Sequence, residues 1–490
     1  MKLNNDRKLL RKAVTGALWQ VLGGSWQTVL RLGTSMVLAR YLEPADFGIF
    51  GMALLVNDFV DRMGPLNMGS GLIVKKDVTQ SDYATCFAMM CAVRLSLFAI
   101  INLIAPFASE YFSDIRLISI LHATSLIFIF TLISSVSRMI LFKSLKFKLI
   151  SIIESLGMLF ESLIAICLVL TTDLTYWALV IAMLSSSFII NIALLLLGEW
   201  RPSLSFDIDS FRFLFRYGIN SLGKNVVEYI IQNIDYFIVG KLFGANYLGL
   251  YEFAYRIPHL VESRFVWPAS GVIFPSLAKI QEHKDRVIHA FIKTTQYIAV
   301  FTFPLLGGLA IVADSVVLLI WGIKWLPVVT PLRILCLSSA IRCIMVPVNS
   351  VYLVNNRPDI SFRTSLINLF FSVPIVTGMG YVYGINGVAL GMLISLIPYV
   401  FINYYWAVKI TSNFLLSLIR SLLAPSLATI LCMISAKLGH NIVGLLGYSI
   451  FLQIFVAVLL GGVIYIGFLF VFAKNLFLEI VDMISILAEK

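Results

Sequence analysis

Apolar stretches of about 20 residues recur along the whole chain, separated by short segments rich in charged residues, Pro and Gly, and each stretch is long enough to span a bilayer as an α-helix. We therefore expect an all-α polytopic membrane protein with about fourteen transmembrane helices. Their expected positions are 13–39, 46–71, 81–107, 115–137, 149–171, 175–198, 213–240, 246–276, 287–313, 328–354, 361–380, 384–408, 417–437 and 446–473.

The basic residues support this number of helices and orient them. If both ends of the chain lie in the cytoplasm, the inner segments hold 23 Lys and Arg residues and the outer loops hold 5. Lys and Arg are enriched in the cytoplasmic loops of membrane proteins. The basic cluster near the N-terminus precedes an apolar segment that is too long for a signal peptide and has no small-residue cleavage site. We expect both termini to be cytoplasmic.

An internal repeat links the two halves of the chain. The segment ARYLEPADFGIFGMA at 39–53 is matched 201 residues later by GKLFGANYLGLYEFA at 240–254, where Gly48 aligns with Gly249. Polar residues are rare in such helices, and at the same offset they coincide in six pairs: Gln20 with Ser221, Gln27 with Glu228, Arg31 with Gln232, Thr34 with Asp235, Asp58 with His259, and Asp61 with Glu262. The sequence identity between the two segments is low, so the evidence for a repeat rests on these polar pairs.

The repeat predicts a two-lobed transporter. The repeat aligns helix one with helix seven, an offset of six helices. Because six is an even number, the two halves run in the same direction through the membrane. Parallel repeats of this kind place the substrate site between two lobes that rock against each other. We expect an N-terminal lobe of six helices at 1–200, a C-terminal lobe of six helices at 201–410, and an extra helix pair with a cytoplasmic tail at 411–490.

Composition excludes several other classes of protein. Of the 490 residues, 59% are hydrophobic and 13% charged, and the mean hydropathy is +0.93, which is typical of a membrane protein. The net charge of +11 reflects loop orientation, so nucleic acid is not an expected partner. The six cysteines show no CxxC spacing and the five histidines no HExxH motif, so we expect buried thiols and no metal site.

Basic and amide side chains inside the helices predict an anionic substrate. Ionisable residues in transmembrane segments usually face the bundle interior and mark substrate or ion pathways. Arg31 has no acidic residue three or four positions away, so its partner must come from another helix, from water or from a ligand. An Arg fork matches phosphate oxygens, which favours a phosphate or pyrophosphate group. The candidate substrate-binding residues are Gln27, Arg31, Lys224, Gln232, Arg256, Lys293 and Arg342.

Acidic residues in the same helices are candidates for ion coupling. They are Asp58, Asp61, Glu228 and Asp235. We expect no cofactor beyond coupling to H⁺ or Na⁺, in which Glu228 and Asp235 exchange basic partners for the ion. The alternative is that pairs such as Lys224–Glu228 and Glu252–Arg256, each four residues apart, are salt bridges that only hold helices together.

The sequence also resembles a known family. LARYLEPADFGIF near residue 40 is similar to the signature of polysaccharide exporters in the MOP (multidrug/oligosaccharidyl-lipid/polysaccharide) flippase superfamily. FPSLAKIQEHKDRV at 274–287 and IWGIKWLPVVTPLRILC at 320–336 resemble the Wzx-type O-antigen and polysaccharide flippases, closest to the colanic acid and teichuronic acid exporters. The resemblance covers nearly the whole chain.

This resemblance implies a MATE/MOP-like flippase in the bacterial cytoplasmic (inner) membrane. Such a protein takes an undecaprenyl-pyrophosphate-linked oligosaccharide from the cytoplasmic leaflet and presents it on the outer face, for the biosynthesis of O-antigen, capsule or exopolysaccharide. The expected partners are the lipid-linked oligosaccharide, membrane lipids, and the polysaccharide polymerase and chain-length machinery. The last helix pair fits the two helices that some family members add to the two lobes.

Two alternatives remain open. A membrane glycosyltransferase or polymerase could use Asp207 and Asp209 as a DxD-like pair, although no nucleotide-binding domain or long outer loop accompanies them, and we do not expect an enzyme. A drug/cation antiporter of the same superfamily would share the two-lobed plan, but its cavity should be dominated by acidic and aromatic residues.

Overall fold

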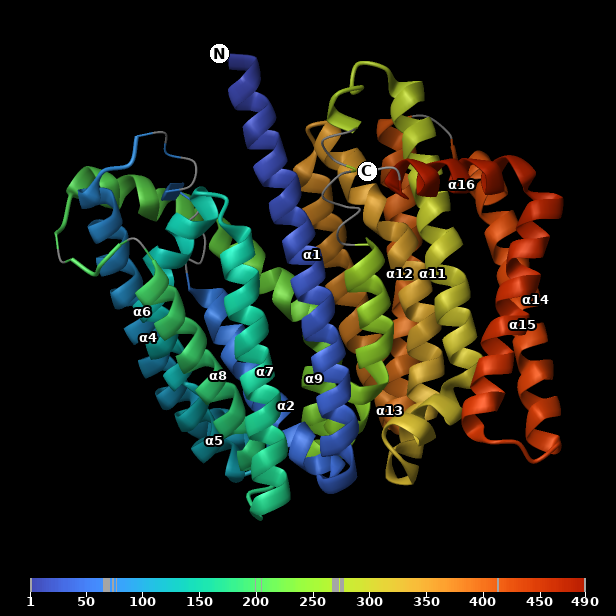
Figure 1. Ribbon diagram of the computed structural model, residues 1–490, viewed down its shortest axis with the longest axis horizontal. Helices are drawn as coiled ribbons and strands as arrows, with labels where there is room; N and C mark the ends of the chain where they lie inside the picture. The colour runs from blue at the N-terminus through green and yellow to red at the C-terminus, as the bar shows by residue number, and fades with distance from the viewer. Residues whose placement is uncertain are drawn as a thin grey trace. The chain divides into compact units, whose positions relative to one another are not determined.

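A computed structural model describes residues 2–64, 71, 72, 75, 77–198, 200–203, 205–266, 273, 277–411 and 414–488 (Figure 1). Within these residues the protein is all helical and contains no strand. The chain divides into two compact units, Met1–Gly249 and Leu250–Lys490. The lobe boundaries at 200 and 410 that the repeat predicts therefore stay a prediction.

Among the described residues of the first unit there are seven complete helices and the beginning of an eighth. They are α1 (Lys2–Tyr41), α2 (Pro44–Met63), α4 (Gln80–Phe112), α5 (Arg116–Thr124), α6 (Leu126–Lys143), α7 (Phe147–Thr171), α8 (Tyr176–Leu197) and the first part of α9 (Ile208–Val261). The helices α5 and α6 follow each other directly and form one apolar span over Arg116–Lys143.

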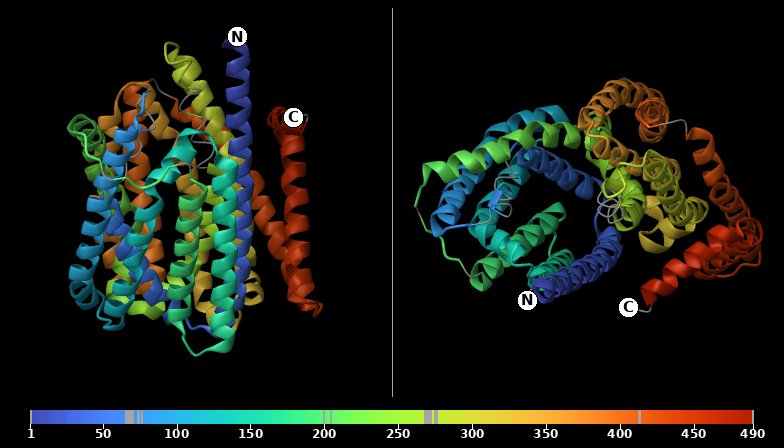
Figure 2. Two further views of the ribbon diagram at one scale, coloured as in Figure 1. Left: turned by 60° about the vertical axis from the view of Figure 1, so that its left-hand side comes forward. Right: turned by 90° about the horizontal axis from the view of Figure 1, so that it is seen from above.

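The second unit begins within α9 and ends with a short helix that lies across its neighbours. Its elements are η1 (Glu262–Val266), α11 (Lys284–Ile320), η2 (Ile323–Val328), α12 (Val329–Val354), α13 (Pro358–Ile410), α14 (Leu415–Leu445), α15 (Ile450–Phe472) and α16 (Lys474–Ala488). In Figure 1, α14 and α15 run roughly vertically, and α16 lies across them near the top of the view. In the view from above, α16 is seen along its length (Figure 2).

Each of the fourteen expected helices coincides with helical structure in the described residues. The helix α9 holds two of them and breaks at Gly244, where φ is 77°. The helix α13 holds another two and breaks at Gly384, where φ is 63°. Glycine adopts a positive φ without a steric penalty, so these residues allow sharp reversals between consecutive helices. The helix α16 was not expected.

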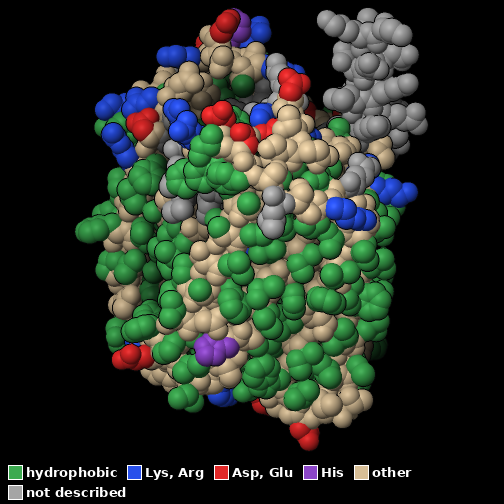
Figure 3. Space-filling model, turned by 90° about the vertical axis from the view of Figure 1, so that its left-hand side faces the viewer, with side chains coloured by type: hydrophobic (Ala, Val, Ile, Leu, Met, Phe, Trp, Pro, Cys, Tyr) green, Lys and Arg blue, Asp and Glu red, His purple; other side chains and the backbone are tan. Residues whose placement is uncertain are grey.

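The chain is a multi-pass membrane protein. Among the described residues, nine helices are long and apolar enough to cross a membrane. On the face shown in Figure 3, apolar side chains cover the middle of the protein and charged side chains gather toward its ends. Leu103 and Phe107 on α4, for example, are 71% and 70% exposed, as lipid-facing residues would be. The total of fourteen spans stays a prediction, because α1, α2 and α9 are not among the nine and α13, which holds two expected helices, is counted once.

The family-like phrase LEPADFG marks the start of α2. Glu43 is the N-cap residue, and its backbone N–H donates to the Asp46 carboxylate at 2.9 Å. Pro44 occupies the first turn, where a missing N–H costs no helical hydrogen bond. This reciprocal capping box fixes where α2 begins and therefore the depth of every polar residue that follows on it.

The two glycines that the repeat aligns pack against each other's helices. A Cβ added at Gly48 would lie 1.7 Å from the carbonyl oxygen of Ala245, and a Cβ added at Gly249 would lie 1.9 Å from that of Pro44. Pro44 and Ala245 are themselves 201 residues apart, so the contact is reciprocal between matched positions. The repeat therefore has a structural counterpart, a crossing that only glycine permits.

We expect Gly48→Ala to lower the free energy of unfolding by about 3 kcal/mol, the upper end of the cost of overpacking, because the methyl group would meet rigid backbone. Thermal unfolding of the purified protein in detergent measures this effect. Gly33→Ala on α1 is the control, because nothing lies within 4 Å of the added Cβ. If the Gly48→Ala protein is as stable as the control, the contact between α2 and α9 at Gly48 has room for a methyl group, and the prediction is wrong.

Candidate functional site

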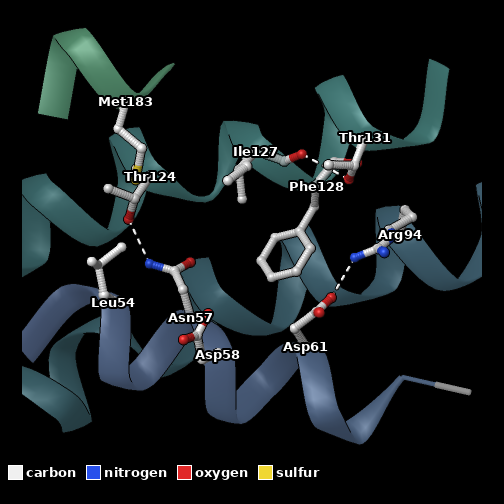
Figure 4. A pocket seen from close by; sticks show the side chains of 10 residues that line it. All are labelled: Leu54, Asn57, Asp58, Asp61, Arg94, Thr124, Ile127, Phe128, Thr131 and Met183. Atoms are coloured by element: carbon white, nitrogen blue, oxygen red, sulfur yellow. Dashed lines mark hydrogen bonds and ion pairs between the residues drawn. The ribbon is translucent and has the colours of Figure 1, made fainter. Parts of the chain in front are cut away.

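A pocket lies inside the first unit, among helices α2, α4, α5, α6 and α8 (Figure 4). Its volume is about 130 Å³. Polar side chains come from successive turns of α2 and from the helices that face it. The lining residues are Leu54, Asn57, Asp58, Asp61, Arg94, Thr124, Ile127, Phe128, Thr131 and Met183.

An ion pair joins the two sides of this pocket. Nη1 of Arg94 on α4 donates to Oδ1 of Asp61 on α2, and the side chains are 17% and 33% exposed. The guanidinium also lies 5.8 Å from the centre of the Phe128 ring, which adds a cation–π contact. Asp58 lines the same pocket, so both acids that the sequence predicts for ion coupling on α2 come together. Their role in coupling stays a prediction.

Arg31 faces an acid that the sequence analysis did not identify. Its guanidinium is exposed on α1 and interacts electrostatically with the carboxylate of Glu161 on α7. Glu154, one heptad before Glu161 on α7, pairs in turn with Arg138 at 2.5 Å. Two acids seven residues apart lie on one helix face, and this spacing is the signal by which the partner of Arg31 could have been found. Gln27, one turn before Arg31, is half-buried.

The predicted residues of α9 divide into exposed and buried positions. Glu228 and Gln232 are exposed, whereas Asp235 is 1% exposed and engages other groups of the protein. The side chain of Lys224 lies outside the described residues, so the predicted pair Lys224–Glu228 remains untested.

In the second unit, Arg342 of α12 is held by Glu262, the first residue of η1, which directly follows α9. Its Nη2 and Nε donate to Oε1 of Glu262 at 2.9 and 3.1 Å, and Nη2 also donates to Ser339 Oγ at 3.0 Å. The guanidinium lies 5.0 Å from the centre of the Tyr255 ring. Glu262 is the residue that the repeat aligns with Asp61, and both acids bind an arginine from a neighbouring helix.

Arg256 makes the local ion pair that its spacing predicts. Its Nη2 donates to Oε1 of Glu252 at 2.7 Å, one turn away on α9. The guanidinium stacks at 4.3 Å over the ring of Phe253. About a quarter of each charged side chain is exposed, so the pair is still accessible to a ligand.

Lys293 of α11 binds the unexpected helix α16. Its ammonium donates to both carboxylate oxygens of Glu479 at 2.7 Å, and the Tyr297 hydroxyl donates to Oε2 of Glu479 at 2.9 Å. The Lys293 hydrogen bond holds the pKa of the Glu479 carboxyl below its usual value of 4.5. The ion pair between Lys293 and Glu479 is therefore fully formed at pH values above the usual pKa of a carboxyl group. It is lost only as the pH falls through the lowered pKa of Glu479.

The DxD-like pair has a structural role instead of a catalytic one. The carboxylate of Asp207 accepts the backbone N–H of Ser210 at 2.8 Å and its hydroxyl at 2.6 Å, which caps the start of α9. These bonds lower the pKa of Asp207. Asp209 is exposed and lies 3.9 Å from Arg212. Within the described residues, no three His, Cys, Asp or Glu side chains converge to hold a metal ion.

The chain matches the family model described as "Polysaccharide biosynthesis protein" over residues 37–330, which is more than half of its length. The protein belongs to this polysaccharide biosynthesis family. The resemblance that the LEPADFG and IWGIKWLP segments suggested is thereby confirmed.

Two relatives of this polysaccharide biosynthesis protein agree with that assignment. It is 24% identical to the lipopolysaccharide biosynthesis protein WzxC of Escherichia coli (strain K12), over 82% of each chain. It is also 24% identical to the teichuronic acid biosynthesis protein TuaB of Bacillus subtilis (strain 168), over 72% of this chain and 74% of TuaB. Among solved structures, the lipid II flippase MurJ has the same fold, with a TM-score of 0.74, 17% identity, and coverage of 94% of this chain and 99% of MurJ.

We expect Glu479→Gln to release α16 from α11, because a neutral amide loses the ionic part of the contact with Lys293. Hydrogen exchange at neutral pH measures the effect, and amides within 474–488 should exchange faster. Asp482→Asn removes an exposed carboxylate from the same helix that makes no ion pair with α11 among the described residues, so it serves as the control. Equal exchange in both variants would show that the Glu479 contact does not hold α16.

Proposed function

We propose that this protein is a flippase that moves an undecaprenyl-pyrophosphate-linked oligosaccharide from the cytoplasmic to the outer leaflet by alternating access. It is a transporter and not an enzyme, and it serves the synthesis of a surface polysaccharide. The proposal includes location in the bacterial inner membrane with both termini cytoplasmic. The polymerase and chain-length machinery that use the product are proposed partners.

The observation that carries the proposal is the set of basic side chains within the helices of a polysaccharide biosynthesis protein. They are Arg31, Arg94, Arg256, Lys293 and Arg342, and each faces an acid of its own unit. Guanidinium groups bind phosphate oxygens in a bidentate manner and keep their charge in an apolar setting. A pyrophosphate is the part of a lipid-linked sugar that such groups recognise.

The acids give these basic groups a resting partner. A basic side chain left alone among apolar helices would be costly. Glu262 neutralises Arg342 and Glu161 interacts with Arg31, so a pyrophosphate must compete with carboxylates for the same donors. We propose that binding exchanges a carboxylate for a phosphate oxygen, and that release reverses the exchange. The acids then reset the site without leaving a cluster of unpaired positive charges.

The membrane potential can drive the forward step. A pyrophosphate diester carries about two negative charges, and an inside-negative potential pushes them outward. At about 2.3 kcal/mol per charge for 100 mV, the full crossing gains roughly 4–5 kcal/mol. Coupling to H⁺ or Na⁺ through Glu228 and Asp235 remains a proposal for the return step.

We expect Arg31→Ala to abolish export of the polysaccharide and to leave lipid-linked units in the cytoplasmic leaflet. Arg31→Lys should also be impaired, because an ammonium does not reproduce the bidentate fork. Surface polysaccharide and protein amount are measured together in cells that lack the native gene. Arg333→Ala is the matched control, since Arg333 pairs with Asp314 at an exposed position. Full export by well-expressed Arg31→Ala would reject the role of Arg31.

A second variant tests the exchange of partners. Glu262→Gln leaves Arg342 without its carboxylate, so pyrophosphate should bind more tightly and leave more slowly. In a reconstituted flipping assay, both KM and kcat should fall. Asp314→Asn, which breaks the exposed pair with Arg333, should change neither. If a folded Glu262→Gln protein keeps the KM and kcat of the wild type, Glu262 is not the competitor of the ligand.

A further inference from the structure

Asn57 has one buried oxygen atom that accepts no hydrogen bond from the described residues. The residue is 5% exposed and lines the pocket of the first unit (Figure 4). Its Nδ2 donates to the Ala53 carbonyl at 2.8 Å and to Thr124 Oγ1 at 2.7 Å, whereas its Oδ1 accepts nothing. A carbonyl can only accept, so the bond to Ala53 fixes which end of the amide is nitrogen. The orphan atom is therefore an acceptor.

Other polar groups of the pocket do not satisfy this oxygen. The Thr124 hydroxyl donates to the Leu121 carbonyl at 3.4 Å, and the Thr131 hydroxyl donates to the Ile127 carbonyl at 2.8 Å. The Arg94 guanidinium donates to the Asp61 carboxylate. A buried acceptor without a donor is costly, because it has lost its hydrogen bonds to water. The pocket thus offers oxygen atoms to something that the protein itself does not supply.

Asp58 adds a negative charge to the same pocket. Its carboxylate makes no hydrogen bond or ion pair with the described residues, and the nearby charges are those of Asp61 and Arg62 on its own helix. Arg62 does not line the pocket; it lies 5.9 Å from the ring of Tyr229 on α9. The Tyr229 hydroxyl is engaged with the Leu55 carbonyl at 2.9 Å. Because Asp58 lines the pocket and is exposed, it lies at the mouth.

We infer that this pocket binds one monovalent alkali-metal cation, held by Asn57 Oδ1 at its inner end and by the Asp58 carboxylate at its mouth. The lining charges are Asp58, Asp61 and Arg94, which leave one negative charge for the cation to neutralise. All the ligands are oxygen atoms, as hard cations prefer. A volume of about 130 Å³ leaves room for the cation and several of its waters.

The lining argues against other ions. It contains no His or Cys, the usual ligands of zinc and copper. A divalent ion such as Ca²⁺ needs several carboxylates, and here Arg94 already neutralises Asp61. The cation bound by Asp58 would place a second positive charge in the pocket beside Arg94 of α4, and the two positive charges would compete for the negative potential of the carboxylates. This competition would link cation binding to the packing of α2 against α4. A role of the cation in transport rests on the proposed flippase function, whereas the binding itself does not.

The test measures binding without any lipid substrate, so its failure is distinct from a failure of flipping. The purified full-length protein is unfolded by heat in NaCl, in KCl and in choline chloride at equal ionic strength and fixed pH. We expect a saturable rise of the melting temperature with Na⁺, K⁺ or both, compared with choline. Binding of radioactive ²²Na⁺ or of the K⁺ analogue ⁸⁶Rb⁺ should saturate at about one ion per chain.

Asp58→Asn should remove both effects. The substitution is nearly isosteric, and because the Asp58 side chain makes no hydrogen bond within the described part of the chain, the variant should fold. Asp173→Asn, the same change at an exposed loop position between α7 and α8, should keep both. The inference is overturned if choline gives the same rise, if Asp58→Asn still binds the ion, or if the melting temperature follows pH alone with no dependence on the alkali cation.

Discussion

A charged side chain in an apolar helix must be neutralised by a nearby opposite charge, and this constraint organises the interior of both units. Arg94 is paired with Asp61 in the first unit, and Arg342 is paired with Glu262 in the second. In each case the acid and the base come from different helices, so the ion pair also fixes how those helices pack. Removing one partner of a buried pair costs more than the pair contributes, because the other charge is left uncompensated.

The same constraint connects stability to transport. A binding site for an anion needs free positive charge, whereas a stable bundle of apolar helices needs none. Carboxylates such as the partly exposed Glu252 and the buried Glu262 satisfy both demands because they can yield their base to a ligand and recover it afterwards. The repeat reinforces this view, since Asp61 and Glu262 are aligned at an offset of 201 and both bind arginine.

Much of the fold could be predicted from the sequence, because apolar length and charged breaks locate membrane helices directly. The repeat aligned Gly48 with Gly249 in the sequence. It could not predict that the two glycines pack against each other's helices, because a sequence alignment does not show which helices are in contact. The acids Glu161 and Glu479 were missed because each lies far along the chain from the base that it contacts. Helix α16 was missed too, although its apolar residues at 476, 477, 480, 484 and 487 follow helical spacing.

Ion pairs between residues that are close in the sequence were the easiest to predict. Glu252 and Arg256 are one helical turn apart, so their contact follows from the spacing alone. The pocket around Asn57 shows the opposite case: two of its acids were selected from the sequence, but the orphan amide oxygen emerges only when α2 and α5 are seen together. Long-range partners need three-dimensional packing, which no single-sequence pattern contains.

Reconstituted flipping of a pyrophosphate-linked oligosaccharide lipid tests the central claim most directly. Proteoliposomes with an inside-negative potential would carry the lipid in the inner leaflet, and its arrival outside would be detected by a lectin that cannot cross the membrane. The account predicts transfer well above that of protein-free vesicles, and little transfer of a neutral glycolipid with the same sugar and tail. Equal transfer of the neutral lipid, or no transfer by folded protein, would contradict it.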